Sequence, residues 1–234
     1  MTTANTPETP ASTPPAPPVP PVPPFGPLKR FGILGGSFNP IHVGHLSIAQ
    51  QVLNALKLEK VILLPAYKPP HKQENRELAS AADRLEMCRL AVHNMHGLDC
   101  SDLELRRDGL SYTVETARTL RQAYGPDAQI YFLIGSDSLA DLPQWYQIQE
   151  LLTLANFAIA ERREVPIQES LWQKLRESLG VNAERQLRRG VVPVDRVDVS
   201  STQIRQLLRT GQRVPGFLRR DVEDYIRARK LYQN

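Results

Sequence analysis

Cysteine is scarce in this chain of 234 residues, which carries only Cys88 and Cys100. Two cysteines are too few for a disulfide-bonded scaffold or a cysteine-based metal cluster. No run of about 18 apolar residues is present, so no membrane-spanning helix is expected. The N-terminus also lacks the basic and apolar regions of a secretory signal. We therefore expect a protein of the reducing cytoplasm, with no membrane partner.

Two common nucleotide-binding signatures are missing as well. Neither GxGxxG nor GxxxxGK[ST] occurs, which argues against dinucleotide-dependent oxidoreductases and P-loop enzymes. Aromatic residues make up 6% of the chain, and no aromatic-rich strand or basic helix stripe accompanies the net charge of +4. A weak positive field suits any polyanionic ligand. The charge alone therefore does not distinguish a nucleotide from a nucleic acid.

Proline is present but unevenly distributed. Eleven of the 20 prolines fall within residues 1–27, where the stretch PPAPPVPPVPP favours polyproline II. That stretch has almost no apolar bulk to bury and is expected to stay solvated. We predict a disordered leader over residues 1–27 and one folded domain over residues 28–234. A Pro-rich ligand for an SH3-like partner is the less favoured interpretation of the leader.

Apolar periodicity divides the remainder into alternating strands and helices. Strand patterns occur at residues 31–35, 61–64, 98–105, 129–134, 157–160 and 191–194. Helical spacing occurs at residues 43–56, 81–95, 113–124, 144–152, 169–179, 201–208 and 221–230. This alternation predicts an α/β fold with a doubly wound, mostly parallel sheet and a small helical C-terminal part. Such sheets bind ligands outside the carboxyl ends of their strands.

The first motif, GGSFNPIHVGH at residues 35–45, follows a predicted strand and opens a helix. Its leading glycines allow backbone N–H groups to approach an anion, and the helix N-terminus adds partial positive charge. His42 and His45 are three residues apart, so both project from one face of the first turn. Both imidazoles could donate to phosphate oxygens. A metal pair is less favoured, because no Asp or Glu lies in the string.

The second motif, VSSTQIR at residues 199–205, follows another strand and begins another helix. Ser200 or Ser201 can cap that helix. Backbone N–H groups, hydroxyls and the Arg205 guanidinium would then converge on phosphate. Alone, the motif is equally typical of a plain helix cap with a solvated arginine. Its pairing with the first motif favours phosphate binding.

Together, the HxGH turn and the SSTxIR helix start resemble the marks of the nucleotidyltransferase superfamily. Further segments resemble bacterial nicotinate-nucleotide adenylyltransferases in the same order: PPHK at 69–72, Arg84 with Met87, Arg107 with SYTV at 111–114, IGSDS at 134–138 and LPQWY at 142–146. The resemblance runs from about Phe31 to Tyr232. It implies a Rossmann-like nucleotidyltransferase fold for the domain predicted at 28–234.

The resemblance implies an adenylyl transfer in NAD biosynthesis. ATP and nicotinate mononucleotide would give nicotinate adenine dinucleotide (deamido-NAD) and pyrophosphate, by direct in-line attack on the α-phosphorus. The protein would align two polyanions and neutralise charge rather than supply a nucleophile. His42, His45 and Arg205 would be the catalytic residues, with His45 the transition-state donor. Mg²⁺ would bridge the triphosphate, and no metal-ligating residue is assigned to the protein.

The resemblance also implies which residues hold each substrate. Ser201, Thr202 and Arg205 would hold the β- and γ-phosphates, and Asp137 would accept from a ribose hydroxyl. The full implied set for ATP is Gly35, Gly36, Ser37, Phe38, His42, His45, Gly135, Asp137, Ser201, Thr202 and Arg205.

A second set would hold nicotinate mononucleotide. Lys72 would reach its phosphate, backbone N–H groups at Thr113 and Tyr146 would hold the carboxylate, and Trp145 would stack on the ring. Tyr112 and Asn39 complete the implied set. Asn39 stands where the family often has Asp, which leaves the role of that position open.

Three alternatives stay open. The acceptor could be nicotinamide mononucleotide or phosphopantetheine, although the segments at 111–113 and 145–146 suit a pyridine ring. HxGH also occurs in class I aminoacyl-tRNA-synthetase-like domains, but a KMSKS-like loop is missing here. A non-catalytic nucleic-acid-binding module is the third alternative, and we expect no nucleic-acid partner. The oligomeric state is left open.

Overall fold

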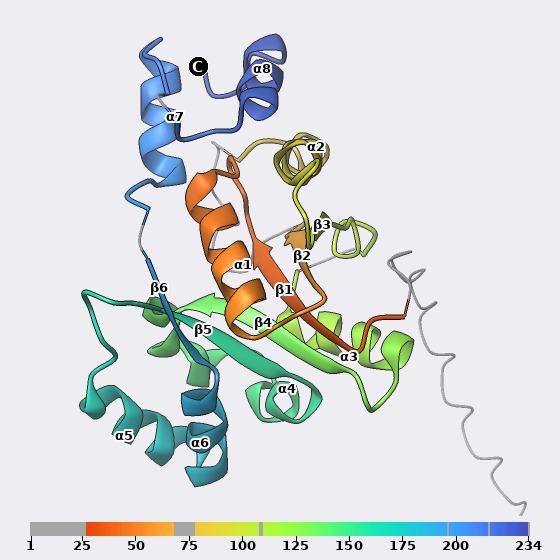
Figure 1. Cartoon of the computed structure of the whole chain (residues 1–234), viewed down its shortest axis with the longest axis vertical. Helices are drawn as coiled ribbons and strands as arrows, with labels where there is room; N and C mark the ends of the chain where they lie inside the picture. The colour runs from red at the N-terminus through yellow and green to blue at the C-terminus, as the bar shows by residue number, and fades with distance from the viewer. Residues whose placement is uncertain (1–26, 68–77, 108–109, 196, 215, 234) are drawn as a thin grey trace, which may run out of the picture.

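The computed structural model describes residues 27–67, 78–107, 110–195, 197–214 and 216–233 (Figure 1). Apart from Pro27, the predicted leader lies outside the described residues. No helix in these ranges has the length and apolar character needed to cross a membrane.

The described chain is organised around one sheet of six strands, all parallel (Figure 1). In chain order the strands are β1 (Arg30–Gly36), β2 (Lys60–Pro65), β3 (Leu98–Cys100), β4 (Gln129–Gly135), β5 (Asn156–Arg162) and β6 (Val191–Val194). Their order across the sheet is β3-β2-β1-β4-β5-β6. The predicted doubly wound, parallel sheet is confirmed.

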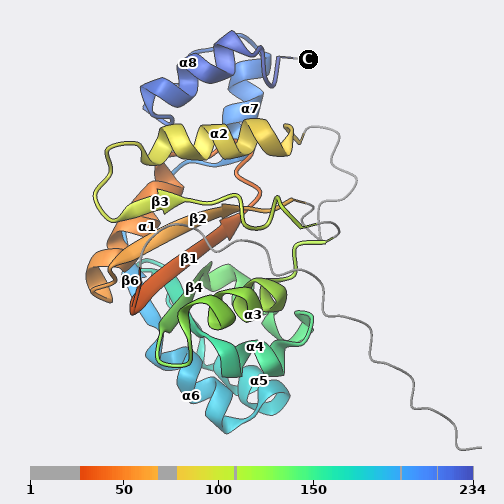
Figure 2. The same cartoon turned by 90° about the vertical axis from the view of Figure 1, so that its right-hand side faces the viewer.

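Two helical layers cover the two faces of the sheet (Figure 2). One layer contains α1 (Val43–Ala55) and α2 (Ala81–Val92), and α7 (Ser201–Arg209) and α8 (Arg220–Ala228) pack on the same side but farther from the sheet, beyond α2. The other contains α3 (Thr113–Tyr124), α4 (Ile148–Leu154), α5 (Glu169–Leu179) and α6 (Val181–Arg189). Two short 3₁₀ turns, η1 (Ser136–Leu139) and η2 (Leu142–Gln144), follow β4.

Alternation along the strands divides the core between these layers. In β2, Val61 and Leu63 pack toward α1 and α2, whereas Ile62 and Leu64 pack toward α3. All four side chains are buried. Strands apolar on both faces are typical of a parallel sheet enclosed between helices. This explains why they read as continuous apolar runs in the sequence.

Two predicted elements differ markedly from the structure. The strand predicted at 98–105 ends at Cys100, because Ser101 Oγ accepts from the Leu103 N–H and the Asp102 carbonyl accepts from Leu105, which bends the chain into turns. The helix predicted at 144–152 begins only at Ile148, because Gln147 adopts a left-handed φ of 51°.

Helix α6 was not predicted from the apolar pattern of the sequence. It has nine residues and follows directly on Gly180, which ends α5 with φ 92°. Its buried face consists of Ala183, Glu184 and Leu187, which is too short an apolar pattern to indicate a helix. The buried Glu184 carboxylate is bonded to Arg188 and, at 3.4 Å, to Arg176.

The strand order reverses next to β1. From β1 the chain proceeds to β2 and β3 on one side, then returns to place β4 on the other side of β1. Open α/β sheets bind ligands in the crevice outside the carboxyl ends of the strands at such a reversal. Gly36 and Gly135 end these two strands. The predicted motifs therefore lie where this architecture places ligands.

Candidate active site

The turn after β1 carries the first motif. Gly36 ends the strand, and an added Cβ there would lie 3.2 Å from the Phe38 ring, tighter than ordinary van der Waals contact. Phe38 is 1% exposed and adopts a left-handed φ of 44°, which is uncommon for a residue other than glycine. Helix α1 then begins at Val43, with His42 as its N-cap. A buried ring and a tight turn thus place both histidines at the carboxyl edge of the sheet.

The two histidine rings lie against each other. Their centroids are 3.7 Å apart, with an interplanar angle of 30°. The His42 backbone N–H donates to Nδ1 of His45 at 3.3 Å. A neutral imidazole that accepts at Nδ1 carries its proton on Nε2. His45 is therefore set up as an Nε2–H donor.

His42 has a different environment. It is buried, and its Nδ1 has no hydrogen-bond partner among the described residues. Burial disfavours the charged imidazolium and lowers the pKa of His42 to about 4. A Cβ at Gly44 would lie 3.0 Å from both His42 Nδ1 and Val199 Cγ1. The glycine of HxGH thus leaves room for Val199 to pack close to His42.

The depressed pKa of His42 makes the fold sensitive to acid. The unfolded chain binds a proton near pH 6.5 and the folded chain only near pH 4, so His42 favours folding above about pH 7 and this advantage is lost as the pH falls. Between pH 7.5 and 5, we expect wild type to lose about 2 kcal/mol more unfolding free energy than His42→Asn. Urea unfolding of both proteins at both pH values measures the difference. Equal losses in the two proteins would refute the link.

The second motif packs directly on the first. Ser200 caps α7 by accepting from the Gln203 N–H at 3.1 Å. Ser201 Oγ donates to the Pro40 carbonyl at 2.9 Å, and Arg205 Nη1 donates to the Asn39 carbonyl at 2.9 Å. The structure thus joins segments 161 and 166 residues apart in the chain. Figure 1 shows the start of α7 beside the start of α1.

A cavity of about 370 Å³ opens between the two motifs. That volume lies within the range of small-molecule sites, roughly 300–1,000 Å³. The lining comes from α1, the carboxyl ends of β5 and β6, and the loop into α7: His42, Gly44, His45, Ile48, Arg162, Val194, Asp195, Val197, Asp198, Val199, Ser200 and Gln203. Both histidines and the cap of α7 therefore face one space.

Gly135 and Asp137 lie beyond the end of the neighbouring strand. Gly135 ends β4, and a Cβ there would approach Asp137 Oδ1 to 2.3 Å. Asp137 lies exposed in η1. A larger residue at 135 would therefore require the exposed Asp137 side chain to turn away from its present position. The arrangement leaves a carboxylate accessible at the reversal between β1 and β4.

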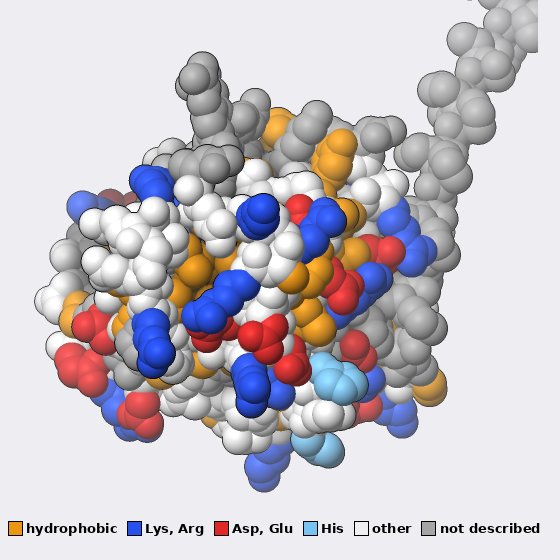
Figure 3. Space-filling view, turned by 90° about the horizontal axis from the view of Figure 1, so that it is seen from above, with side chains coloured by type: hydrophobic (Ala, Val, Ile, Leu, Met, Phe, Trp, Pro, Cys, Tyr) orange, Lys and Arg blue, Asp and Glu red, His pale blue; other side chains and the backbone are white. Residues whose placement is uncertain are grey.

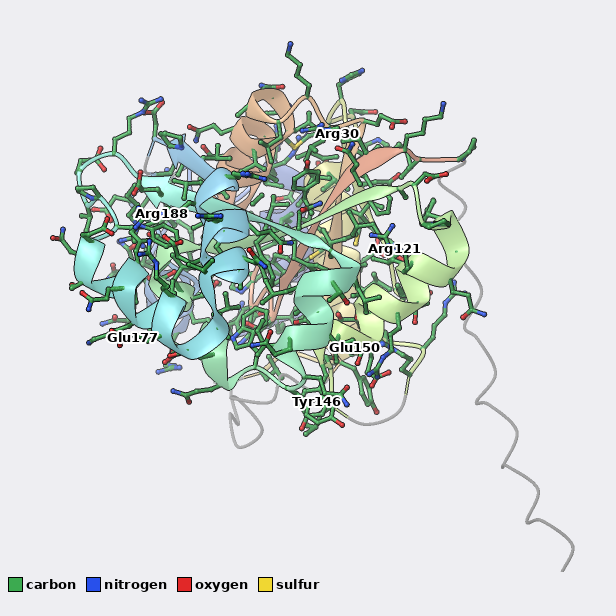
Figure 4. All side chains as sticks on the ribbon, turned by 90° about the horizontal axis from the view of Figure 1, so that it is seen from below. Arg30, Arg121, Tyr146, Glu150, Glu177 and Arg188 are labelled. Atoms are coloured by element: carbon green, nitrogen blue, oxygen red, sulfur yellow. The ribbon has the colours of Figure 1, made fainter. Side chains whose placement is uncertain are left out.

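The residues implied for the acceptor lie at the start of α3 and before α4. Thr113 is the first residue of α3, whose N-terminus has no side-chain cap. The Tyr112 and Tyr146 rings lie 4.6 Å apart, and Tyr146 is 51% exposed, projecting from the surface in Figure 4. Trp145 is half-buried, with its ring 6.1 Å from Phe157. Lys72 lies outside the described residues.

Asn39 is enclosed by three segments that are distant in the chain. It is 3% exposed, and its Oδ1 accepts from the Ala79 N–H at 3.0 Å and from Tyr232 OH at 2.7 Å. Its side-chain oxygen therefore ties the turn after β1 to the start of α2 and to the C-terminal segment. Burial raises the pKa of Tyr232 well above its usual range, which keeps this donor protonated.

Several residues at the site received no role from the sequence. Arg84 was quoted only as part of a pattern, and Tyr232, Gln203 and Asp198 were not singled out at all. Neither periodicity nor a local pattern reveals the contacts of Arg84 and Tyr232, because these contacts join segments that are far apart in the chain. Among the described residues, no group of three or more His, Cys, Asp or Glu side chains could hold a metal ion.

The face of the molecule that carries α7 and α8 has charges of both signs. Figure 3 views the molecule from the end that carries α7 and α8, and Lys and Arg side chains there are interspersed with Asp and Glu. On α8, for example, the Glu223 carboxylate accepts from Arg227. A nucleic-acid-binding surface is instead expected to gather basic side chains on one face.

Comparison with known proteins identifies relatives over most of the chain. A family model described as cytidylyltransferase-like matches residues 33–207. A relative from Synechococcus sp. (strain JA-3-3Ab), named probable nicotinate-nucleotide adenylyltransferase, is 43% identical over 204 residues, or 87% of this chain and 95% of the relative. A relative of the same name from Enterococcus faecalis (strain ATCC 700802 / V583) is 38% identical over 209 residues, or 88% and 86% of the two chains.

Solved structures agree with the fold. The Plasmodium falciparum nicotinic acid mononucleotide adenylyltransferase complexed with NaAD is similar with a TM-score of 0.68, over 87% of this chain and 97% of that chain. The sequence identity is 21%. At this identity, the similarity supports the fold alone.

Proposed function

Because this chain belongs to the nicotinate-nucleotide adenylyltransferase family of cytidylyltransferase-like proteins, we propose that it transfers the adenylyl group of ATP to nicotinate mononucleotide. The products are nicotinate adenine dinucleotide and pyrophosphate, a step of NAD biosynthesis. The family predicted from the motifs is confirmed. The observation that supports the proposed chemistry most is the contact between the HxGH turn and the SSTxIR helix beside one cavity.

The proposed reaction needs no nucleophile from the protein. The mononucleotide phosphate attacks the α-phosphorus of ATP in line, and pyrophosphate leaves. Negative charge grows on the phosphate oxygens, so hydrogen-bond donors already in place there lower the barrier. His45 supplies an Nε2–H donor, whose tautomer is set by the His42 backbone N–H. Arg205 and the start of α7 supply a guanidinium and helix N–H groups for the outer phosphates.

His42 is proposed to change its charge when ATP binds. In the free protein, burial keeps it neutral at pH 7. A nearby polyanion favours the imidazolium and raises the pKa, so binding would draw a proton onto the buried ring. ATP is proposed to bind as its Mg²⁺ complex, which belongs to the substrate and neutralises part of the triphosphate charge.

Acceptor choice is proposed to depend on the start of α3. An uncapped helix N-terminus presents backbone N–H groups and partial positive charge. A pyridine carboxylate suits these donors, whereas a carboxamide also brings an N–H₂ that faces them. Imperfect pairing of a buried polar group costs about 1–3 kcal/mol. Preference for the acid, rather than absolute exclusion of the amide, is therefore the expected result.

Pyrophosphate release tests both the reaction and the acceptor. The purified protein is incubated with Mg²⁺–ATP and either nicotinate or nicotinamide mononucleotide, with an acceptor-free sample as background. We expect kcat/KM to be about 10- to 100-fold higher for the acid. Faster turnover of the amide would overturn the acceptor assignment. Absence of release with both mononucleotides would overturn the reaction, and phosphopantetheine is then the next acceptor to assay. The cytoplasmic location stays a prediction.

A further inference from the structure

Arg84 is the largest fully buried side chain of the described residues, at 1% exposure. It lies on α2, beneath the turn after β1. Its guanidinium donates to three backbone carbonyl oxygens: Ser37 at 2.9 Å, Ala79 at 3.1 Å and Tyr67 at 3.3 Å. Burial lowers the pKa of Arg84, but a guanidinium stays protonated in proteins. A full positive charge is therefore held inside the protein by carbonyl dipoles.

Such an arrangement is costly for stability alone. A buried charge loses its hydration, and an apolar side chain of similar volume is often at least as stabilising. The three carbonyls belong to three separate segments that follow or precede regular elements. A forked cation with five N–H donors can hold all three at fixed positions, which an apolar side chain or a single ammonium cannot do. The geometry therefore indicates a positioning task.

The first segment held by Arg84 is the turn after β1, which is proposed to bind the phosphates of ATP. The Ser37 carbonyl belongs to the peptide that precedes Phe38, the residue with φ 44°. On the other side of Phe38, the Asn39 carbonyl accepts from Arg205. A left-handed conformation at a bulky residue persists only where its surroundings hold it. Arg84 and Arg205 thus hold the turn from both sides.

The second segment leads to the acceptor side. Tyr67 follows β2; its carbonyl accepts from Arg84, and its N–H donates to Ser111 Oγ at 3.0 Å. Ser111 directly precedes Tyr112 and α3, whose start is proposed to hold the pyridine carboxylate. The carbonyl and N–H groups of Tyr67 therefore connect Arg84 with the region that is proposed to bind the acceptor.

We propose that Arg84 is a positioning residue that fixes the Ser37–Asn39 turn relative to the Tyr67–Ser111 connection, so that both substrates are aligned for in-line transfer. It touches neither substrate and acts through backbone carbonyls. The inference rests on the proposed function, since alignment of two substrates matters only for a transfer reaction. Misplacement of reacting groups by about 1 Å can lower the rate about 100-fold.

The test compares Arg84→Met, Arg84→Lys and Leu175→Ala with wild type. Methionine removes the forked guanidinium but keeps a similar side-chain volume, and lysine keeps the positive charge. Leu175 is buried on the opposite side of the sheet from Arg84, so its replacement lowers stability without touching the Arg84 contacts. We expect kcat to fall about 100-fold in Arg84→Met and about 10-fold in Arg84→Lys. Leu175→Ala should melt earlier yet keep kcat within about twofold when assayed below its melting temperature. A kcat that decreases from wild type to Arg84→Lys and further to Arg84→Met would indicate a positioning role. Lost stability alone should not lower kcat, as Leu175→Ala is expected to show.

A measurement of nucleotide binding tests the role of Arg84 independently of the proposed reaction. The affinity for α,β-methylene-ATP, measured by calorimetry, is expected to fall about 10-fold in Arg84→Met and to stay unchanged in Leu175→Ala. An inactive wild type that still binds the analogue would count against the proposed reaction only. Folded Arg84 variants with wild-type kcat and affinity would overturn the role of Arg84. If Arg84→Met does not fold, wild-type kcat and affinity in Arg84→Lys would overturn it equally.

Discussion

Replacing His45 with alanine is expected to lower kcat for pyrophosphate release by about a thousandfold. The structure fixes this imidazole at the start of α1, where its Nδ1 accepts from the His42 N–H and its Nε2 carries the proton. A donor placed before reaction stabilises growing phosphate charge without reorganisation. His45 is only half-buried, and its ring contacts those of Phe38 and His42, so the fold should remain intact. Steady-state kinetics and circular dichroism of the variant measure the two effects.

His93→Ala is the matched control for this experiment. His93 is an exposed histidine at the C-cap of α2, away from the cavity. Its replacement should change kcat by less than about twofold, as is usual for surface substitutions. A fully active His45→Ala protein would show that His45 has no catalytic role. Equal losses in both variants would indicate an effect unrelated to phosphate chemistry.

Replacing Arg205 is also expected to impair the use of ATP strongly. In Arg205→Ala we expect kcat/KM for ATP to fall about 100-fold or more, mainly through a higher KM. The guanidinium is shared between the Asn39 carbonyl at 2.9 Å and Thr202 Oγ1 at 3.4 Å, so its fork is oriented before ATP binds. Lysine cannot reproduce that fork, and Arg205→Lys should recover only a small part of the activity.

Arg209→Ala provides the control for Arg205. It removes the same charge from the last turn of the same helix, α7. Its kcat/KM for ATP should stay within about threefold of wild type, because charges far from the ligand are screened by salt. Comparable losses from both substitutions would mean that net charge, rather than the placed guanidinium, governs binding. Kinetics at 0.05 and 0.3 M salt distinguish the two explanations.

The sequence was sufficient for the architecture because parallel strands buried on both faces leave a strong signal. The runs at Val61–Leu64 and Phe157–Ala160 are apolar throughout, and each is followed by a helical pattern or a turn. The number and order of strands in the chain followed from these runs. The place of β4 beside β1 did not, since only long-range packing determines which strands are neighbours.

Elements with few apolar residues were harder to predict. Helix α6 buries only Ala183, Glu184 and Leu187, and its Glu184 is stabilised by arginines rather than by burial of apolar surface. The end of β3 at Cys100 depends on local hydrogen bonds at Ser101 and Asp102. Such bonds follow from side-chain geometry, which apolar periodicity does not record.

For the candidate site, the motifs indicated which residues to consider but not the groups that contact them. His42 and His45 were predicted to share one face of a helical turn, and the structure stacks their rings. The loss of proton affinity at His42 could not be foreseen, because it depends on burial. Likewise, Asn39 was considered for its charge relative to Asp, whereas the structure uses its oxygen to accept from Ala79 and Tyr232. Buried polar connections of this kind become visible only once distant segments are in contact.

A crystal structure with bound α,β-methylene-ATP and Mg²⁺ tests the central claim most directly. We predict that one triphosphate contacts both motifs, with phosphate oxygens within about 3 Å of His45 Nε2 and of the Arg205 guanidinium. The same complex should place the adenosine toward the ends of β1 and β4, near Asp137. A triphosphate bound away from either His45 or Arg205 would contradict the account.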